Sequence, residues 1–219
     1  MDDRKVLRAL LDGLGPWMQR EGFGRQTERD AYSRLQGQAV QSVVPTVVCW
    51  TSSDYWDVHC HLELRFDEVE ELLNRYKPHL SATQGEHTVT VRHVMEDLLP
   101  EGDDSRPLSL VMARDVPDIL PDLEDRLSTY GLLYLHRWST LKRLERGYLG
   151  DSEMWPEADP IRRFENLLAI AVLDKDRAKF DAVVRDGLGF MAKHRGGFYL
   201  KTFEGIAQGL SNDESWHPS

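Results

Sequence analysis

The segment from Asp57 to Phe66 constrains the fold more than any other, because its apolar and polar residues alternate strictly. The apolar set is Val58, Cys60, Leu62, Leu64 and Phe66, and the polar set is Asp57, His59, His61, Glu63 and Arg65. Successive side chains of a strand point to opposite faces of its sheet. We therefore predict an antiparallel strand with one face in the core and the other facing water.

The residues around this segment predict the rest of a sheet. From Arg25 to Phe66 the chain is rich in β-branched residues, with turn signals at Gly37 and at Ser52-Ser53-Asp54, which is typical of an antiparallel meander. Pro45 has no amide donor, so we expect an edge or a bulge there. Further strands at residues 88–94 and 108–112 would complete a sheet of about five strands, a typical size.

Helical spacing of apolar residues marks the two ends of the chain. Val6 to Met18 predicts an amphipathic helix, and Gly22 follows as its terminator. A short helix capped by Asp67 is expected next, ending near Pro78. After Asp115 the chain is predicted to be helical. The helix beginning at Asp159-Pro160 is expected to form an antiparallel hairpin with a partner helix capped by Asp174.

These elements predict an α+β fold, in which an antiparallel sheet of about five strands packs with an N-terminal helix and a C-terminal helical region follows. We expect an α+β domain over residues 1–150, a helical hairpin over 151–210 packed on it, and a flexible tail over 211–219. Gly150 to Glu157 is the expected linker.

Composition excludes several classes of function. The chain has 219 residues and a formal net charge of −10, which disfavours a nucleic-acid ligand. Its longest apolar run, Leu167 to Leu173, is far shorter than the roughly 18 residues of a membrane span, and its first residues lack an export signal. The two cysteines form no CxxC pair. We expect a cytoplasmic protein that contacts neither membrane nor nucleic acid.

The acidity is uneven along the chain. From His93 to Arg126 there are ten acidic and three basic residues. The segment is either a solvated surface or a docking surface for a basic protein partner. Apolar stripes on the C-terminal hairpin also leave a homo-oligomer open.

His59, His61 and Glu63 are the candidate metal ligands. The two histidines lie on one face of the predicted strand about 7 Å apart, a spacing that metal sites use. His87 and His93 share a face of another predicted strand and would supply a third ligand. A polar surface row is the alternative.

Three aromatic residues bracket the predicted Ser/Asp turn: Trp50, Tyr55 and Trp56. Large rings at a hairpin tip either fold back onto the sheet or contact a partner. They are the candidate partner-binding residues.

No motif for nucleophilic or phosphate chemistry is present. The sequence lacks a GxSxG elbow and a Walker loop, and its glycines at positions 13, 15, 22 and 24 do not follow a strand. No catalytic residue and no cofactor is predicted.

Three short motifs resemble the uncharacterised bacterial family called domain of unknown function 4304. They are Glu21-Gly22-Phe23, Tyr32-Ser33-Arg34 and Val40-Gln41-Ser42. The resemblance covers about the first two thirds of the chain, and Tyr130 to Arg143 is compatible with the closing helix of that family. It implies a helix against an antiparallel sheet and no established activity.

Two functional hypotheses follow. The first is a non-enzymatic bacterial protein-binding protein of the immunity or accessory type, with an acidic surface for a basic partner and an aromatic anchor. The second is a metal-dependent enzyme or small-molecule binder built on His59, His61 and Glu63.

Overall fold

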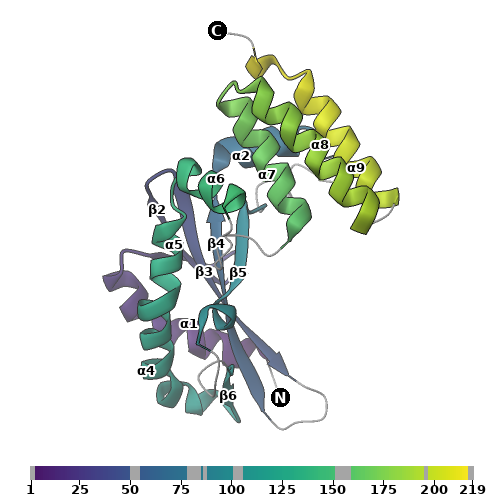
Figure 1. The fold of residues 1–219 in the computed structure, drawn as a ribbon. Helices are drawn as coiled ribbons and strands as arrows, with labels where there is room; N and C mark the ends of the chain where they lie inside the picture. Colours follow the sequence, from purple (N-terminus) through teal and green to yellow (C-terminus); the bar gives the residue numbers. More distant parts are fainter. Residues whose placement is uncertain are drawn as a thin grey trace. The chain divides into compact units, whose positions relative to one another are not determined.

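The computed structural model describes residues 3–49, 55–77, 85, 88–100, 106–150, 159–194 and 197–216, which form two compact units (Figure 1). Unit 1 comprises Met1–Leu64 and Arg92–Ser139, and unit 2 comprises Arg65–Val91 and Thr140–Ser219. Both units are therefore built from two separate stretches of chain.

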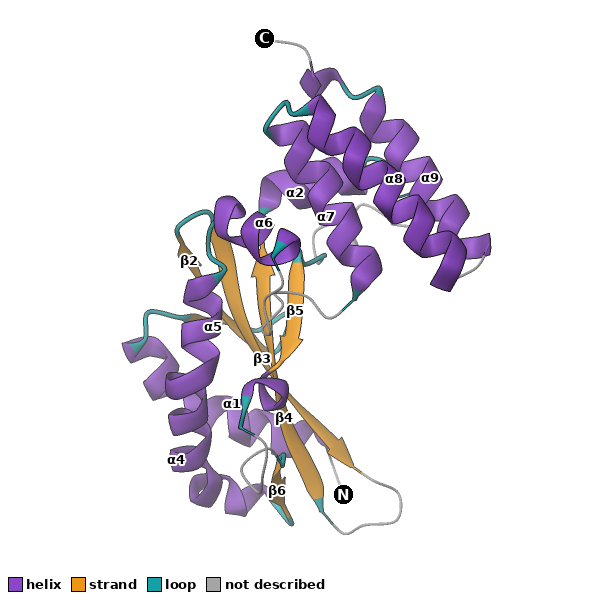
Figure 2. Ribbon diagram, in the orientation of Figure 1, coloured by secondary structure: helices purple, strands orange, loops and turns teal. Residues whose placement is uncertain are grey.

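Unit 1 combines a sheet with helices (Figure 2). Its helical elements are α1 (Asp3–Arg20), η1 (Met95–Leu98), η3 (Ala113–Asp115), α4 (Val116–Arg126), the π-helical turn η4 (Leu127–Gly131) and α5 (Leu132–Arg137). The strands are β1 (Gly24–Gln26), β2 (Ala31–Gln36), β3 (Ala39–Cys49), β4 (Trp56–Arg65), β5 (Val91–Val94) and β6 (Leu108–Leu110). The predicted α+β class is confirmed.

The sheet has six strands in the order β1-β2-β3-β4-β5, and β6 pairs with β4 beside this path. The pairs β1–β2, β2–β3 and β4–β6 are antiparallel. The β2–β3 turn depends on Gly37, which has a φ of +64°. A Cβ atom at Gly37 would also lie 3.0 Å from the carbonyl oxygen of Ser139, so this position favours glycine for two reasons.

One face of the sheet forms the core with α1 and α5. The Tyr32 hydroxyl donates to the Leu11 carbonyl of α1. Gln41 donates to the Leu135 carbonyl of α5 at 3.0 Å. Tyr32 pairs with Val43, two positions from Gln41 along β3, so both side chains lie on the same face. The two helices therefore cover one face together.

The predicted alternation of β4 is confirmed on the core side and corrected on the other. Its even-numbered apolar residues are buried, as predicted. On the opposite face, however, Asp57 and Glu63 are also buried. Ser109 donates to Asp57 at 3.0 Å, and arginine side chains contact Glu63, so this face is less open to water than alternation alone predicts.

Arg34 connects the three motifs on which the family resemblance is based. Its guanidinium group lies 4.3 Å from the centre of the Phe23 ring and donates to the Glu21 carbonyl. Its Nε donates to Gln41 at 2.9 Å. The end of α1, β2 and β3 thus meet at one side chain, which fixes the end of this helix against the two strands.

Pro45 lies within β3, where no interruption of the strand is seen. The β2–β3 ladder ends at the pair Tyr32–Val43, so β2 no longer pairs with β3 at Pro45. The missing amide donor is tolerated because this part of β3 has edge character on that side.

Unit 2 is helical in its described residues. It contains α2 (Asp67–Asn74), α6 (Leu141–Leu149), α7 (Pro160–Leu173), α8 (Arg177–His194), α9 (Gly197–Ser211) and η5 (Glu214–Trp216). The predicted hairpin of α7 and α8 is confirmed, but α9 is a third helix that packs against both. Asp159 caps α7 as predicted, accepting from the Ile161 amide at 3.0 Å.

Two other predicted caps are wrong. Asp174 ends α7, and Asp176 instead accepts from the Lys179 amide at 2.9 Å in the first turn of α8. Asp67 is the first residue of α2 and its carboxylate accepts from Arg65, while Phe66 occupies the cap position. In both cases a neighbouring residue has the backbone position that the cap requires.

The predicted domain boundaries need correction. Residues 65–91 lie inside the expected first domain but belong to unit 2, and unit 2 begins at Thr140 rather than at 151. Trp216, in the expected flexible tail, packs edge-on against Phe180 and donates to the Leu210 carbonyl at 2.8 Å. The last helical turn of the described chain is therefore part of unit 2. The expected linker, from 151 onwards, and residues 217–219 lie outside the described residues.

Across the described part of the chain, no helix has the length and apolar character that crossing a bilayer requires.

Candidate functional site

Glu63, near the end of β4, is the most constrained residue of the predicted polar row. Its side chain is 2% exposed and binds two arginines. Arg29, from the β1–β2 turn, donates to Oε2 at 2.8 Å. Arg92, from β5, donates to Oε1 through Nε at 2.9 Å and Nη2 at 2.6 Å. Both carboxylate oxygens are therefore occupied by guanidinium groups of the same chain.

His59 and His61 lie on the same face as Glu63 and are half-buried. His59 Nδ1 is 3.7 Å from the Oε1 atom of Glu96. Burial raises the pKa of Glu96, although its own backbone amide and His59 act in the opposite direction. Burial and then the charge of Arg92 lower the pKa of His61. At neutral pH we therefore expect a neutral His61 beside two cationic arginines.

The metal-site prediction is not supported by this arrangement. Glu63 already binds two cationic side chains, which repel a metal ion. His93 stacks on Tyr134 of the core face at 5.1 Å, while its neighbour Arg92 points to Glu63, so His93 cannot join His61. His87 lies outside the described residues. Within the described ranges, no three His, Cys, Asp or Glu side chains are grouped so that they could hold a metal ion.

The two described residues of the predicted aromatic anchor differ in exposure. Tyr55 is 41% exposed, whereas Trp56 is fully buried. The Trp56 indole nitrogen donates to Asp3 of α1 at 2.8 Å, so the ring folds back onto the core. Trp56 is therefore not a partner-binding residue, and Trp50 lies outside the described residues.

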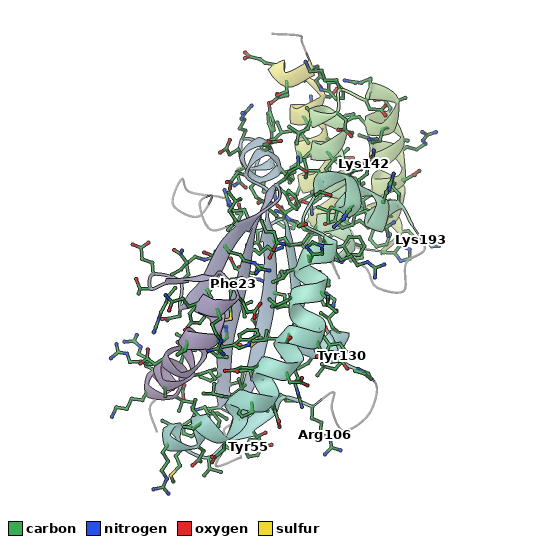
Figure 3. All side chains as sticks on the ribbon, turned by 90° about the vertical axis from the view of Figure 1, so that its left-hand side faces the viewer. Phe23, Tyr55, Arg106, Tyr130, Lys142 and Lys193 are labelled. Carbon is green, nitrogen blue, oxygen red and sulfur yellow. The ribbon has the colours of Figure 1, made fainter. Side chains whose placement is uncertain are left out.

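Tyr55 is accompanied by exposed apolar residues that were not predicted from the sequence. Trp56 pairs with Leu110 in the β4–β6 ladder, so Tyr55 and Val111 leave this ladder at the same end. Val111 is 52% exposed and Met112 is 37% exposed. We call Tyr55, Val111 and Met112 the tip patch. Figure 3 shows Tyr55 near the end of unit 1 that carries α4.

Acidic side chains follow the tip patch directly in the chain. The Met112 amide donates to Asp115 at 2.9 Å, immediately before α4 begins. On α4, Asp118, Asp122 and Asp125 are exposed. Their spacing of four and three residues places them along one side of the helix. We call these three residues the acidic ridge.

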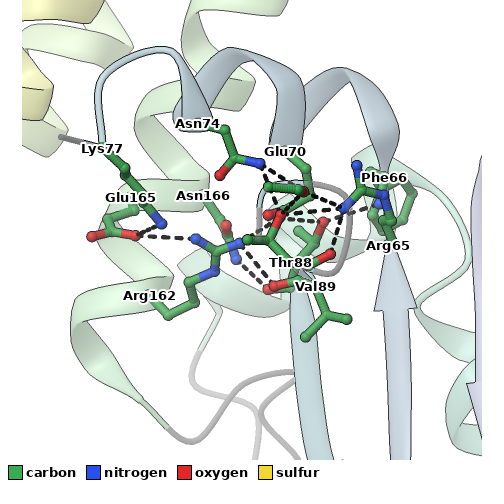
Figure 4. A network of polar contacts seen from close by, with 12 residues as sticks. Arg65, Phe66, Glu70, Asn74, Lys77, Thr88, Val89, Arg162, Glu165 and Asn166 are labelled. Carbon is green, nitrogen blue, oxygen red and sulfur yellow. Dashed lines mark hydrogen bonds and ion pairs between the residues drawn. The ribbon is translucent and has the colours of Figure 1, made fainter. Parts of the chain in front are cut away.

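Unit 2 contains a buried polar network that was also not predicted from the sequence (Figure 4). Glu70 is fully buried in α2 and accepts from Thr90 at 2.9 Å and from Arg162 of α7. Arg162 also donates to the Val89 carbonyl at 2.8 Å and to Glu165 at 3.2 Å. In the sequence, this network is indicated by the position of Glu70, a charged residue three positions before Leu73 on the apolar side of α2.

Comparisons with protein-family models, with curated proteins and with solved structures gave no match. The resemblance to domain of unknown function 4304 therefore stays a prediction from its three motifs.

The described residues thus offer two kinds of surface chemistry. The tip patch and the acidic ridge combine exposed apolar area with negative charge. The Glu63 cluster combines two guanidinium groups with a neutral imidazole. The buried network of unit 2 joins α2 to α7 through internal bonds, which is a structural role.

Proposed function

We propose that this chain is a non-enzymatic binding protein that docks a basic protein partner on the tip patch and the acidic ridge. The exposure of Tyr55, Val111 and Met112 together at one end of the β4–β6 ladder is the observation that carries the proposal. Adjacent large apolar side chains cost free energy in water, and such groups mark interaction sites. Tyrosine and methionine are also enriched in protein interfaces.

Charge selects the kind of partner. The net charge of −10 and the three carboxylates of the ridge attract a basic surface and repel an acidic one. Complementary charges speed association and fix orientation, while the apolar patch supplies the desolvated centre of the contact. A basic partner with an apolar anchor fits both features.

An immunity or accessory protein that bacteria encode beside a toxin or a secretion partner has these requirements. It needs a charged docking surface and no chemistry of its own. A nuclease toxin, which is basic because it binds phosphate backbones, has the complementary charge.

The test compares three immobilised proteins in lysate of the cell that encodes the chain, at low salt. They are the wild type, the double variant Tyr55→Ser with Val111→Ser, and the control Leu133→Ser, which removes a still more exposed apolar residue from α5. We expect wild type and control to retain the same basic protein, and the double variant to release it. Roughly 0.5 M salt should weaken retention because it screens charge.

Two results would contradict the proposal. One is a set of captured proteins that does not differ between the wild type and the double variant. The other is a partner that is acidic, or whose retention does not depend on salt.

A further inference from the structure

The hairpin of α8 and α9 ends in exposed aromatic and basic side chains. Phe198 and Tyr199, in the first turn of α9, are 67% and 45% exposed, and the centres of their rings are 5.6 Å apart. Lys193, in the last turn of α8, and Lys201 of α9 are exposed as well. We call these four residues the basic end of unit 2.

The pattern of α9 explains why Phe198 faces solvent. The residues that this helix buries are Phe203, Ile206, Ala207 and Leu210. Phe203 comes five positions after Phe198, which places the two rings on different sides of a helix with about 3.6 residues per turn. Lys201 comes three positions after Phe198, so these two side chains are neighbours on the exposed side. A large ring and a cation are therefore presented together, and exposed apolar groups of this kind mark interaction sites.

The basic end is locally positive on an acidic chain. The net charge is −10, yet the sequence between Asp186 and Glu204 contains no acidic residue. Lys193, which Figure 3 shows at the edge of unit 2, and Lys201 form no ion pair with any residue that the structure describes. Ammonium groups of this kind attract carboxylates that come within a Debye length, about 8 Å at physiological salt.

Unit 1 carries the complementary surface. The tip patch offers exposed apolar side chains, and the acidic ridge offers three exposed carboxylates. The rings of Phe198 and Tyr199 match the apolar part, where the thioether of Met112 makes favourable contacts with aromatic rings. The two lysines match the carboxylates of the ridge. Both the charge and the apolar character of the basic end therefore fit the tip patch and the acidic ridge of another copy.

We propose that a second copy of this chain docks its basic end on the tip patch and the acidic ridge. This inference rests on the proposed function, because it names a competitor of the basic partner for the same surface. Every copy carries both surfaces, so each finds its complement at its own concentration. The contact joins two unlike surfaces, and such contacts continue from copy to copy unless a ring closes. Binding of the basic partner releases the docked copy.

The test is complementation between two double variants, followed by sedimentation equilibrium at low salt. Phe198→Ser with Lys201→Gln removes the basic end, and Tyr55→Ser with Val111→Ser removes the tip patch. We expect the average mass of the wild type to rise with concentration. Association of either variant alone should weaken at least about tenfold, as the loss of a buried aromatic anchor does. Each variant keeps the surface that the other has lost, so their equimolar mixture should form a 1:1 complex and nothing larger.

The matched control is Leu149→Ser with Lys142→Gln. It removes a 59% exposed apolar side chain and an exposed lysine from α6 of the same unit. We expect this protein to associate as the wild type does. Roughly 0.5 M salt should weaken association of both proteins, because it screens the lysines from the ridge.

Three results would overturn the inference. They are a wild-type mass that stays constant up to roughly 1 mM, the range of weak contacts, a variant that associates alone as strongly as the wild type, and a mixture that forms no complex. A foreign acidic protein that binds the basic end of a chain without self-association also contradicts it.

The lysate experiment separates this inference from the proposed function. If the wild type does not self-associate but still retains a basic partner, only this inference fails. If complementation succeeds but no basic partner is retained, only the proposed function fails. A retained copy of the chain itself reports self-association and not partner binding.

Discussion

Arg162 shows at the level of one residue how strongly a buried charge depends on its partner. Replacing Arg162 by Ala leaves the Glu70 carboxylate, which is fully buried, without its cation. We expect the free energy of unfolding to fall by about 3–5 kcal/mol, the usual cost of breaking a buried pair from one side. Urea denaturation followed by circular dichroism measures this change.

The control for this prediction removes both charges. In the double variant Glu70→Met with Arg162→Met, no unpaired charge remains and the volume is nearly kept. We expect this protein to be clearly more stable than Arg162→Ala. Equal stability of the two variants would mean that packing, and not the unpaired charge, causes the loss.

The same carboxylate predicts a response to acid. Burial alone raises the pKa of Glu70, but Arg162, Thr88 and Thr90 outweigh it, so the pKa in the folded state lies below its ordinary value of 4.5. A carboxyl group with a lowered folded pKa stabilises the protein above its unfolded pKa and loses this contribution as pH falls through the folded pKa.

We therefore expect the urea midpoint of the wild type to fall as pH drops below about 4.5. Glu70→Gln cannot titrate, so its midpoint should fall less over the same range. The measurement is a series of urea titrations between about pH 3 and 7. Parallel curves for the two proteins would show that other carboxyl groups cause the acid sensitivity.

At the level of elements, two glycines of α8 provide a matched pair. A Cβ atom at Gly187 would overlap the Phe203 ring of α9, while one at Gly189 would meet nothing within 4 Å. Phe203 is fully buried and cannot easily move. We expect Gly187→Ala to destabilise the protein by about 1–3 kcal/mol, as overpacking does.

Gly189→Ala should instead stabilise the protein. It adds a methyl group on the exposed side of the same helix, where alanine stabilises by about 0.5–1 kcal/mol relative to glycine. Thermal melts of the two variants and the wild type measure both changes in stability. If both melt at the same temperature, α8 and α9 do not pack through Gly187 as described.

Elements with a clear period could be predicted from the sequence, and the surroundings of single side chains could not. The core side of β4 and the helical spacing of α1 each depend on local pattern, and both were predicted correctly. Trp56 follows the same alternation as the core residues of β4, yet the aromatic composition of the tip suggested exposure. The partner of its indole, Asp3, lies 53 residues away, and local sequence does not show it.

The candidate site was predictable to a similar extent. Its row of polar residues on one face of β4 follows from the two-residue repeat of a strand alone. The arginines that occupy Glu63 come from the β1–β2 turn and from β5, so they are brought there by strand order. The metal hypothesis was wrong about the role of Glu63 because one sequence does not reveal which strands are neighbours.

On the scale of the whole molecule, the chain does not fold as consecutive domains. Residues 65–91 join the C-terminal helices, and Tyr76 donates to Asp213 at 2.7 Å while Asn166 donates to the Thr90 carbonyl at 2.7 Å. Burial and the bond to Asp213 raise the pKa of Tyr76 to about 12. These contacts tie the first stretch of unit 2 to the second.

This arrangement predicts how a fragment behaves. Residues 140–219 alone lack α2 and the segment before β5. Arg162 then loses Glu70, Asp213 loses Tyr76, and the side of α7 that packs on α2 becomes exposed. We expect the fragment to have a weaker helical signal per residue at 222 nm than the same residues in the full chain, and no cooperative melt. A fragment that melts cooperatively would show that α7, α8 and α9 form an autonomous domain, in which case the buried pair of Glu70 and Arg162 would be dispensable for folding.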